Sequence, residues 1–269
     1  MKTTVPDLPV VSEQYHYRFL HRIFFTGLDE GLQRTFVWHD RATDYYSNLV
    51  SISNSNRTAA PQALAQAEEL LLSKNRRPCI YTTPHSLPSD LAQSLNEHRY
   101  QRAFTDAWMY FSGGAECKLP SGIGIREVQD QDELALFVEI FNRAYSGSDP
   151  NEPYGKAPPE WGETVFDSFK KTDPLNHVIY HLLFSGGEAV AVLISVTRDG
   201  LAGLYSIGTI PEKRGRGYGG LLTLKAVADL QSRGAHTIFL QTEQNSCNEK
   251  FYTKLGFNTR WLGQAWVKK

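Results

Sequence analysis

The sequence has few cysteines and methionines and no long apolar run. Its three cysteines, Cys79, Cys117 and Cys247, are widely spaced and form no Cys-x-x-Cys pair, which argues against a disulfide framework and a zinc site. No stretch approaches the ~18–20 apolar residues of a membrane-spanning helix, and the first residues carry no signal-peptide core. We therefore expect a cytoplasmic protein with reduced thiols, without a metal and without a membrane partner.

An excess of charge of either sign is also absent. The 28 Lys and Arg residues nearly balance the 29 Asp and Glu residues, which leaves a formal net charge of -1. Chains that bind nucleic acid through general electrostatic attraction are usually basic, so nucleic acid is not an expected partner. The composition is that of a globular protein, and 269 residues are enough for two modest domains, each with its own core.

A small, polar stretch with Gly and Pro, residues 111–122, separates two patterned regions and predicts a first domain of residues 1–117 and a second of residues 118–269. Hydrophobic periodicity in the second region predicts four helices that follow an opening strand and alternate with later strands. The predicted strands are 123–128, 177–184, 188–196, 201–210, 237–242 and 261–267, and the predicted helices are 132–145, 159–170, 221–232 and 248–255. This order predicts an α+β fold with a mixed central sheet flanked by helices.

The first region offers part of the same order, as a smaller αβαβ domain. A helix at 64–74, a strand at 79–83, a helix at 89–98 and a strand at 107–111 are expected there. Its Ala107-Trp108 pair occurs near where Ala265-Trp266 occurs in the second region. The match favours a degenerate internal duplication, although two αβαβ runs could also resemble each other by chance.

A glycine loop in the second region carries the clearest functional signal. The run Glu212-Lys213-Arg214-Gly215-Arg216-Gly217-Tyr218-Gly219-Gly220 lies between a predicted strand and an apolar helix. Bare backbone amides at a helix N-terminus bind anions, and the two arginines add positive charge. The loop has neither a Gly-Lys-Ser/Thr ending nor a Gly-x-Gly-x-x-Gly followed by an acidic residue, so it predicts a different phosphate-bearing cofactor. A flexible turn or an Arg-Gly contact to nucleic acid is the alternative.

This region resembles the GCN5-related N-acetyltransferase superfamily. The acyl-CoA loop of that family reads Arg/Gln-x-x-Gly-x-Gly/Ala, which Arg214, Gly217 and Gly219 satisfy. The family also tends to carry an Asn after the next strand and, seven residues on, a Tyr followed by x-Lys-x-Gly-Phe; here these are Asn245 and Tyr252 to Phe257. The resemblance covers residues 122–269, and the first domain would be a degenerate, truncated copy.

The resemblance implies an acyl-CoA N-acyltransferase fold with acetyl-CoA as cosubstrate. The backbone of residues 207–209 would pair with the pantetheine arm, the amides of residues 215–220 would hold the pyrophosphate, and Asn245 would contact the cofactor near its arm. Many family members have a small residue where this chain has Asn248, so the contact is left open between the two asparagines. The implied cofactor-binding residues are Ile207, Gly208, Thr209, Arg214, Gly215, Arg216, Gly217, Tyr218, Gly219, Gly220, Asn245 and Asn248.

Acyl transfer to an amine also needs an acid and a base. By resemblance Tyr252 donates a proton to the CoA sulfur; the alternative is a core tyrosine in the apolar cluster with Phe251 and Phe257. Glu243, near the end of its strand, is the leading candidate for the base, and a solvated strand-end carboxylate is the alternative. His177 and His181 lie on one strand face and are weaker candidates.

The acceptor is expected to bind at residues 146–170, which resemble the variable acceptor-binding segment of the family. Carboxylates beside aromatic rings suit a cationic amine, although an acidic surface that aids solubility explains the same residues. They are Asp149, Glu152, Tyr154, Glu160, Trp161, Glu163 and Asp167. We therefore expect transfer of an acetyl group from acetyl-CoA to a primary amine, of a small molecule or a protein, by direct attack in a ternary complex. A non-catalytic acyl-CoA-binding or scaffold protein is the alternative, and a homodimer is left open.

Overall fold

The computed structural model describes residues 8–31, 34–52, 60–86, 90–114, 117–147, 156–171, 175 and 177–269. The chain forms two compact units, unit 1 with residues 1–108 and 260–269, and unit 2 with residues 109–259. A compact unit is not by itself a product of duplication or an independent domain. The predicted boundary at residue 117 and the predicted duplication therefore stay predictions.

Seven helices and eleven strands are found in the described residues. The helices are α1 (Leu8–Ile23), α2 (Ala60–Ser73), α3 (Leu91–Glu97), α4 (Gln131–Ala144), α5 (Pro159–Lys170), α6 (Tyr218–Ser232) and α7 (Cys247–Lys254), with the short 3-10 helix η1 (Pro211–Lys213). The strands are β1 (Gly27–Glu30), β2 (Arg34–Trp38), β3 (Leu49–Ile52), β4 (Cys79–Thr82), β5 (Tyr100–Phe111), β6 (Ile123–Glu127), β7 (His177–Ser185), β8 (Glu188–Arg198), β9 (Leu201–Thr209), β10 (Thr237–Glu243) and β11 (Phe257–Lys268). Strands β5 and β11 each begin in one unit and end in the other.

Unit 1 is built on strands β1 to β4 and the last part of β11. Strands β1, β2 and β3 are antiparallel neighbours, β3 and β4 are parallel, and β11 pairs antiparallel with β4, where Trp266 lies opposite Ile80. One hydrophobic cluster joins the buried face of α2, including Leu64 and Leu71, to this sheet and to Trp266. The last segment of the chain therefore completes the core of the first unit.

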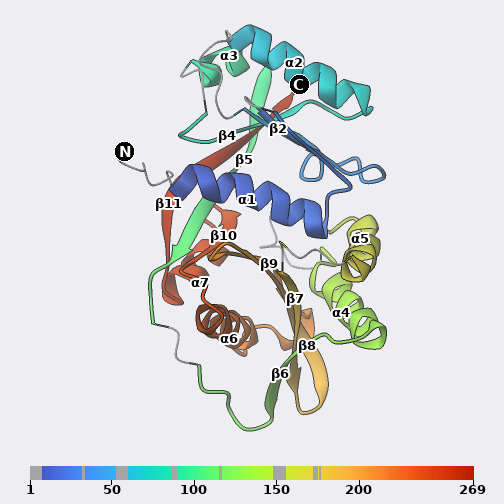
Figure 1. The fold of residues 1–269 in the computed structure, drawn as a ribbon, viewed down its shortest axis with the longest axis vertical. Coiled ribbons are helices and arrows are strands. Elements are labelled where there is room, and N and C mark those ends of the chain that lie inside the picture. The colour runs from blue at the N-terminus through green and yellow to red at the C-terminus, as the bar shows by residue number, and fades with distance from the viewer. Residues whose placement is uncertain are drawn as a thin grey trace. The chain divides into compact units, whose positions relative to one another are not determined.

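Unit 2 holds a sheet in the order β10-β9-β8-β7-β6, in which only β9 and β10 are parallel. Helices α4 and α5 cover one face of this sheet and α6 covers the other (Figure 1). Strand β8, in the middle of this sheet, is buried along nearly its whole length, from Ala189 to Val196. The predicted α+β fold with a mixed central sheet flanked by helices is confirmed.

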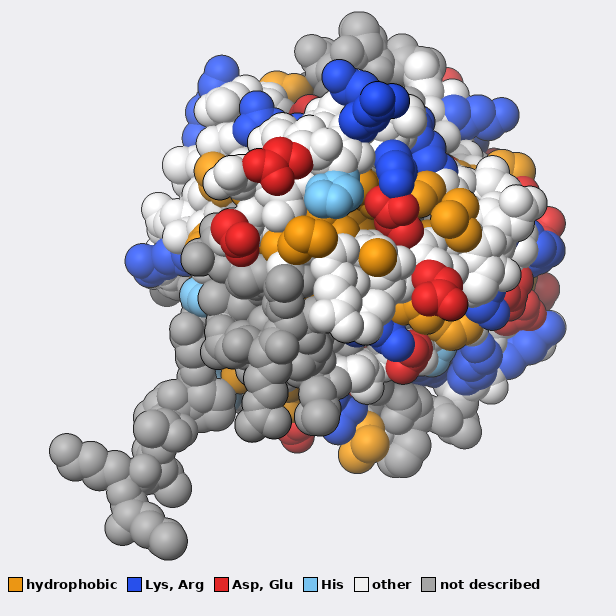
Figure 2. Space-filling view, turned by 90° about the horizontal axis from the view of Figure 1, so that it is seen from above, with side chains coloured by type: hydrophobic (Ala, Val, Ile, Leu, Met, Phe, Trp, Pro, Cys, Tyr) orange, Lys and Arg blue, Asp and Glu red, His pale blue; other side chains and the backbone are white. Residues whose placement is uncertain are grey.

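The surface agrees with the balanced composition. On the face that Figure 2 shows, acidic and basic side chains are interspersed, and hydrophobic side chains form small, separate areas. Among the described helices, none combines the length and the apolar character that crossing a membrane requires.

Candidate functional site

The parallel strands β9 and β10 pair only at their beginnings. The register runs from Leu201 opposite Thr237 to Gly203 opposite Phe239, yet β9 continues to Thr209 and β10 to Glu243. Among the described residues that follow Gly203 in β9 and Phe239 in β10, no further pair joins the two strands. Beyond Gly203, this edge of β9 is therefore not joined to β10.

A bulge interrupts β9 in the same half. In the antiparallel pairing with β8, Ile194 lies opposite Tyr205 and Val192 opposite Gly208, so two residues of β9 stand against one of β8. One of the two, Ser206, has a φ of 52°. A bulge of this kind turns the main chain and redirects its polar groups, and such positions are common beside active sites.

The end of α4 packs directly on this bulged segment. A Cβ atom on Gly208 would lie 2.8 Å from Ala144 Cβ and 2.9 Å from Tyr145 Cε2, so only glycine allows the approach. The hydroxyl of Tyr145 donates a hydrogen bond of 3.1 Å to the carbonyl oxygen of Ile207. Gly208 was predicted from its main-chain role, and packing gives a second reason for it. Tyr145 was not predicted as a site residue.

The glycine loop follows β9 and leads into α6 as predicted. Gly215 and Gly217 have φ values of 74° and 81°, and Gly217 is the N-cap of α6 without a side-chain cap. The first hydrogen bond inside the helix joins the amide of Leu221 to the carbonyl of Gly217 at 3.0 Å. The amides of residues 218–220 therefore point out of the helix end, which is the arrangement that binds anions.

The two arginines of the loop lie in different surroundings. Arg214 is half-buried, and its Nε donates to the carbonyl oxygen of Thr209 at 3.1 Å while its Nη2 donates to that of Ala144 at 2.7 Å. Arg216 is exposed. The sequence assigned both to the cofactor; the structure gives Arg214 hydrogen bonds to main-chain carbonyls of β9 and α4.

Helix α7 begins with a capping box beside the first asparagine of the second motif. Ser246 Oγ accepts a hydrogen bond of 3.1 Å from the amide of Glu249, and Glu249 Oε2 accepts one of 2.6 Å from the amide of Asn245. Asn245 is exposed with a φ of 62°, and Asn248 is half-buried. The Ser-x-x-Glu pattern was readable in the sequence and would have placed the helix start at Cys247, where it is found, instead of Asn248.

The three predicted parts of the site meet at Gly219. A Cβ atom placed there would lie 3.6 Å from Phe251 Cζ and 3.7 Å from Thr209 Oγ1, so the start of α6 touches both α7 and the end of β9. Tyr252, next to Phe251, is 9% exposed, and its ring packs edge-on against Phe251 and Phe257. The apolar packing and the small exposed fraction are compatible with both roles that the sequence left open for Tyr252.

Glu243 is the last residue of β10 and is half-buried. Its main-chain carbonyl accepts a hydrogen bond of 3.3 Å from the amide of Ser246, which ties the end of the strand to the start of α7. Glu243 therefore lies where β10 leads into α7, and its role as a base stays a prediction.

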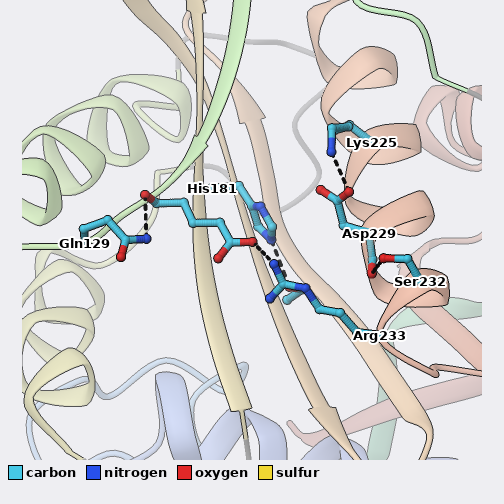
Figure 3. A network of polar contacts seen from close by, with 8 residues as sticks. Gln129, His181, Lys225, Asp229, Ser232 and Arg233 are labelled. Carbon is cyan, nitrogen blue, oxygen red and sulfur yellow. Dashed lines mark hydrogen bonds and ion pairs between the residues drawn. The ribbon is translucent and has the colours of Figure 1, made fainter.

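The weaker histidine candidates differ from each other. His177 is exposed, whereas His181 is buried and its Nε2 lies 3.0 Å from Ser195 Oγ. Burial lowers the pKa of His181 to about 4, a shift that Asp229 opposes and that Arg233 and Lys225 reinforce. Figure 3 shows Lys225 and Asp229, which pair with each other on α6, and Arg233, which follows the last residue of the helix. His181 is therefore a buried, neutral group at ordinary pH.

Of the segment expected to bind the acceptor, the structure describes residues 146–147 and 156–170. Asp149, Glu152 and Tyr154 lie outside the described residues. Ser146 and Lys156 form an isolated antiparallel bridge, so the segment leaves and returns at one place. In α5, Glu163 and Asp167 are exposed, and Glu160 and Trp161 are half-buried. No group of three or more His, Cys, Asp and Glu side chains suited to a metal ion occurs among the described residues.

Comparisons with known proteins agree with this geometry. The sequence model of the FR47-like protein family matches residues 183–267, which include β9, the glycine loop and α7. An uncharacterized N-acetyltransferase of Methanocaldococcus jannaschii is 25% identical over 209 residues, 74% of this chain and 85% of that protein. The mycothiol acetyltransferase of Thermobispora bispora is 43% identical over 158 residues, but the match covers 54% of this chain and only 49% of that protein.

The fold is shared over nearly the whole chain. A GCN5-related N-acetyltransferase from Kribbella flavida superimposes with a TM-score of 0.70 at 15% identity, covering 98% of this chain and 96% of that one. The chain therefore has the acyl-CoA N-acyltransferase fold. The chain is similar in sequence to N-acetyltransferases and to the FR47-like family, and it is an acyltransferase.

Proposed function

We propose that the protein transfers an acetyl group from acetyl-CoA to a primary amine by direct attack in a ternary complex. The observation that carries this proposal is that the pairing of β9 with β10 ends at Gly203, and that β9 is followed by the outward-pointing amides at the start of α6. A CoA molecule has the matching order of groups, because its pantetheine arm carries amides and its pyrophosphate carries negative charge. A strand edge followed by an anion site fits these two parts in sequence.

In this proposal the main chain of residues 207–209 pairs with the pantetheine arm, and the amides of residues 215–220 hold the pyrophosphate. Arg216 is exposed beside these amides and adds charge. Asn245 or Asn248 contacts the arm from the start of α7. The contact of α6 with both Thr209 and Phe251 supports the arrangement, because one ligand could touch all three elements.

The reaction breaks the C–S bond of the thioester and forms a C–N bond. The amine nitrogen must first lose a proton, which Glu243 accepts through a water molecule in this proposal. A main-chain amide of the bulged β9 segment stabilises the oxyanion that forms on the carbonyl oxygen. Tyr252 then donates a proton to the departing thiolate and regains it from solvent. The acceptor is an amine of a small molecule or a protein; the relative named for mycothiol matches over only half of its own length.

Release of free thiol from acetyl-CoA, measured against a panel of amines, tests the proposal. Transfer to at least one amine, with a ternary-complex rate law, is the expected result. Binding of acetyl-CoA without thiol release for any amine would instead support a non-catalytic acyl-CoA-binding protein. Absence of any binding of acetyl-CoA would contradict both.

Replacing Gly217 by valine is expected to weaken acetyl-CoA binding about tenfold or more, equal to about 1.4 kcal/mol, because the side chain would stand among the amides at the start of α6. A matched control is Gly234→Val just after the end of α6. Both glycines have positive φ, 81° and 92°, and an added Cβ meets nothing within 4 Å at either, so the backbone strain is similar. Titration of both variants with acetyl-CoA should show a loss for Gly217→Val alone; equal affinities would contradict the anion site.

A further inference from the structure

Two side chains tie the end of α4 to the acyl-CoA strand β9. The hydroxyl of Tyr145 donates to the carbonyl of Ile207 at 3.1 Å. The guanidinium of Arg214 donates to the carbonyl of Thr209 at 3.1 Å and to that of Ala144 at 2.7 Å. We call this pair, Tyr145 and Arg214, the α4–β9 clamp. Gly208 lies between the two strand carbonyls, at the point where α4 comes closest.

The charge of Arg214 suits this position for a physical reason. The last carbonyls of a helix have no partner inside the helix and carry the negative end of its dipole. A guanidinium has donors in a planar fork, so one arginine can bind a carbonyl of α4 and a carbonyl of β9 together. A half-buried arginine held in this way is oriented by its own protein before any ligand binds.

The clamp also fixes the root of the segment that follows α4. The carbonyl oxygen of Tyr145 accepts a hydrogen bond of 3.0 Å from the amide of Ala157, and Ser146 bridges Lys156. Ser146 follows Tyr145 directly in the chain, and Ala157, beyond the intervening segment, is hydrogen-bonded to Tyr145. Tyr145 is also the residue that is bonded to β9. Any movement of the end of α4 relative to β9 would move both ends of that segment.

We propose that Arg214 and Tyr145 are positioning residues that hold the acceptor-binding segment against the acyl-bearing strand, and that Arg214 serves this purpose instead of binding the pyrophosphate. The inference rests on the proposed function, in which β9 carries the acyl donor and residues 146–170 bind the acceptor. It differs from the sequence-based prediction, which counted Arg214 among the residues that hold the cofactor.

Two acyl donors separate the roles of Arg214. Acetyl-CoA carries the pyrophosphate, and S-acetylpantetheine lacks it together with the nucleotide. A clamp acts on both donors equally, so Arg214→Gln should raise the KM for the amine and lower kcat about tenfold with either donor while changing donor KM little. Arg216→Gln is the matched variant, and its effect should fall on acetyl-CoA affinity alone. A defect of Arg214→Gln that vanishes with S-acetylpantetheine would overturn the proposal.

Tyr145→Phe tests the second member of the clamp without removing charge. It should show the same pattern as Arg214→Gln, and the double variant should lose less than the product of the two single effects, because both act through one contact. Fully multiplicative effects, or a Tyr145→Phe variant with unchanged kinetics, would contradict a shared clamp. Arg214→Lys keeps the charge but lacks the fork, so it should restore little of the loss.

A measurement on the free protein separates failure of the clamp from failure of the proposed function. Amide hydrogen exchange at Ala157, whose amide is bonded to the Tyr145 carbonyl, should become at least several-fold faster in Arg214→Gln and stay unchanged in Arg216→Gln. Unchanged exchange in Arg214→Gln would overturn the clamp even if the enzyme transfers acetyl groups. Faster exchange in a protein that acetylates no amine would support the clamp and reject the proposed reaction.

Discussion

Replacing Tyr252 by phenylalanine is expected to lower kcat about 100-fold and to change acetyl-CoA affinity less than about twofold, since general acid catalysis contributes about 10²–10⁴-fold. The substitution removes only the hydroxyl, and the ring keeps its edge-on contacts with Phe251 and Phe257. The fold should therefore be unaffected. Turnover is measured as thiol release at saturating substrates, and affinity as a calorimetric titration of acetyl-CoA.

The control for this variant is Tyr110→Phe, which also removes a buried hydroxyl from unit 2, where Tyr110 packs near Phe239. Its kcat should stay close to that of the unaltered protein. A second measurement tests the role itself: an acetyl thioester of a more acidic thiol needs no proton on departure, so it should reduce the defect of Tyr252→Phe. An equal defect with both thioesters would assign Tyr252 to another task, and an unchanged kcat would remove it from the reaction.

Unit 2 is expected to lose about 3 kcal/mol of stability between pH 6.5 and pH 4 through His181, because the pKa falls from an ordinary 6.5 to about 4 in the folded state. Between these values the unfolded chain binds the proton and the folded protein does not. Unfolding therefore takes up a proton in this window, and stability falls as the pH is lowered. Burial is the main cause, since the ring is nearly enclosed next to Ser195.

Denaturant unfolding at a series of pH values measures this effect. His181→Asn keeps a polar group near Ser195 but does not titrate, so its stability should depend less on pH than that of the unaltered protein. His177→Asn, on the same strand but exposed, should keep the full dependence. Burial also lowers the pKa of His16 in unit 1, to about 3, so the comparison is made between variants, in which the contribution of His16 cancels. Parallel pH profiles for His181→Asn and the unaltered protein would contradict the assignment.

The parts of the site that lie within one local segment were predictable from the sequence. The glycine loop has a local cause, because Gly215 and Gly217 take positive φ values that glycine accepts easily. The start of α6 was predicted three residues late, at Leu221, because Tyr218 and two glycines precede the apolar pattern. The last strand was likewise predicted from Trp261, whereas β11 begins at Phe257.

The parts that depend on distant residues were not predictable. Tyr145 fits the helical pattern of α4 and reaches Ile207, 62 residues further along the chain, with no local signal for that contact. The partner of Arg214 on α4, Ala144, is 70 residues away. Ser206 takes a positive φ in the bulge although it is not a glycine, so its residue type does not predict this conformation. In unit 1, α1 and the strands β1 to β3 were not predicted, since strands of four or five residues carry little periodicity.

The division of unit 1 into two distant stretches has a consequence for synthesis on the ribosome. Residues 1–108 emerge first, but the strand segment that pairs with β4 and supplies Trp266 follows only after all 151 residues of unit 2, counted from 109 to 259. At about 5–20 residues per second this delay is roughly 8–30 s. During that time the edge of β4 that later pairs with β11 is open, and an open strand edge can join another nascent chain. Unit 2 is continuous in sequence, so the unit that carries the candidate site is the first that can fold completely.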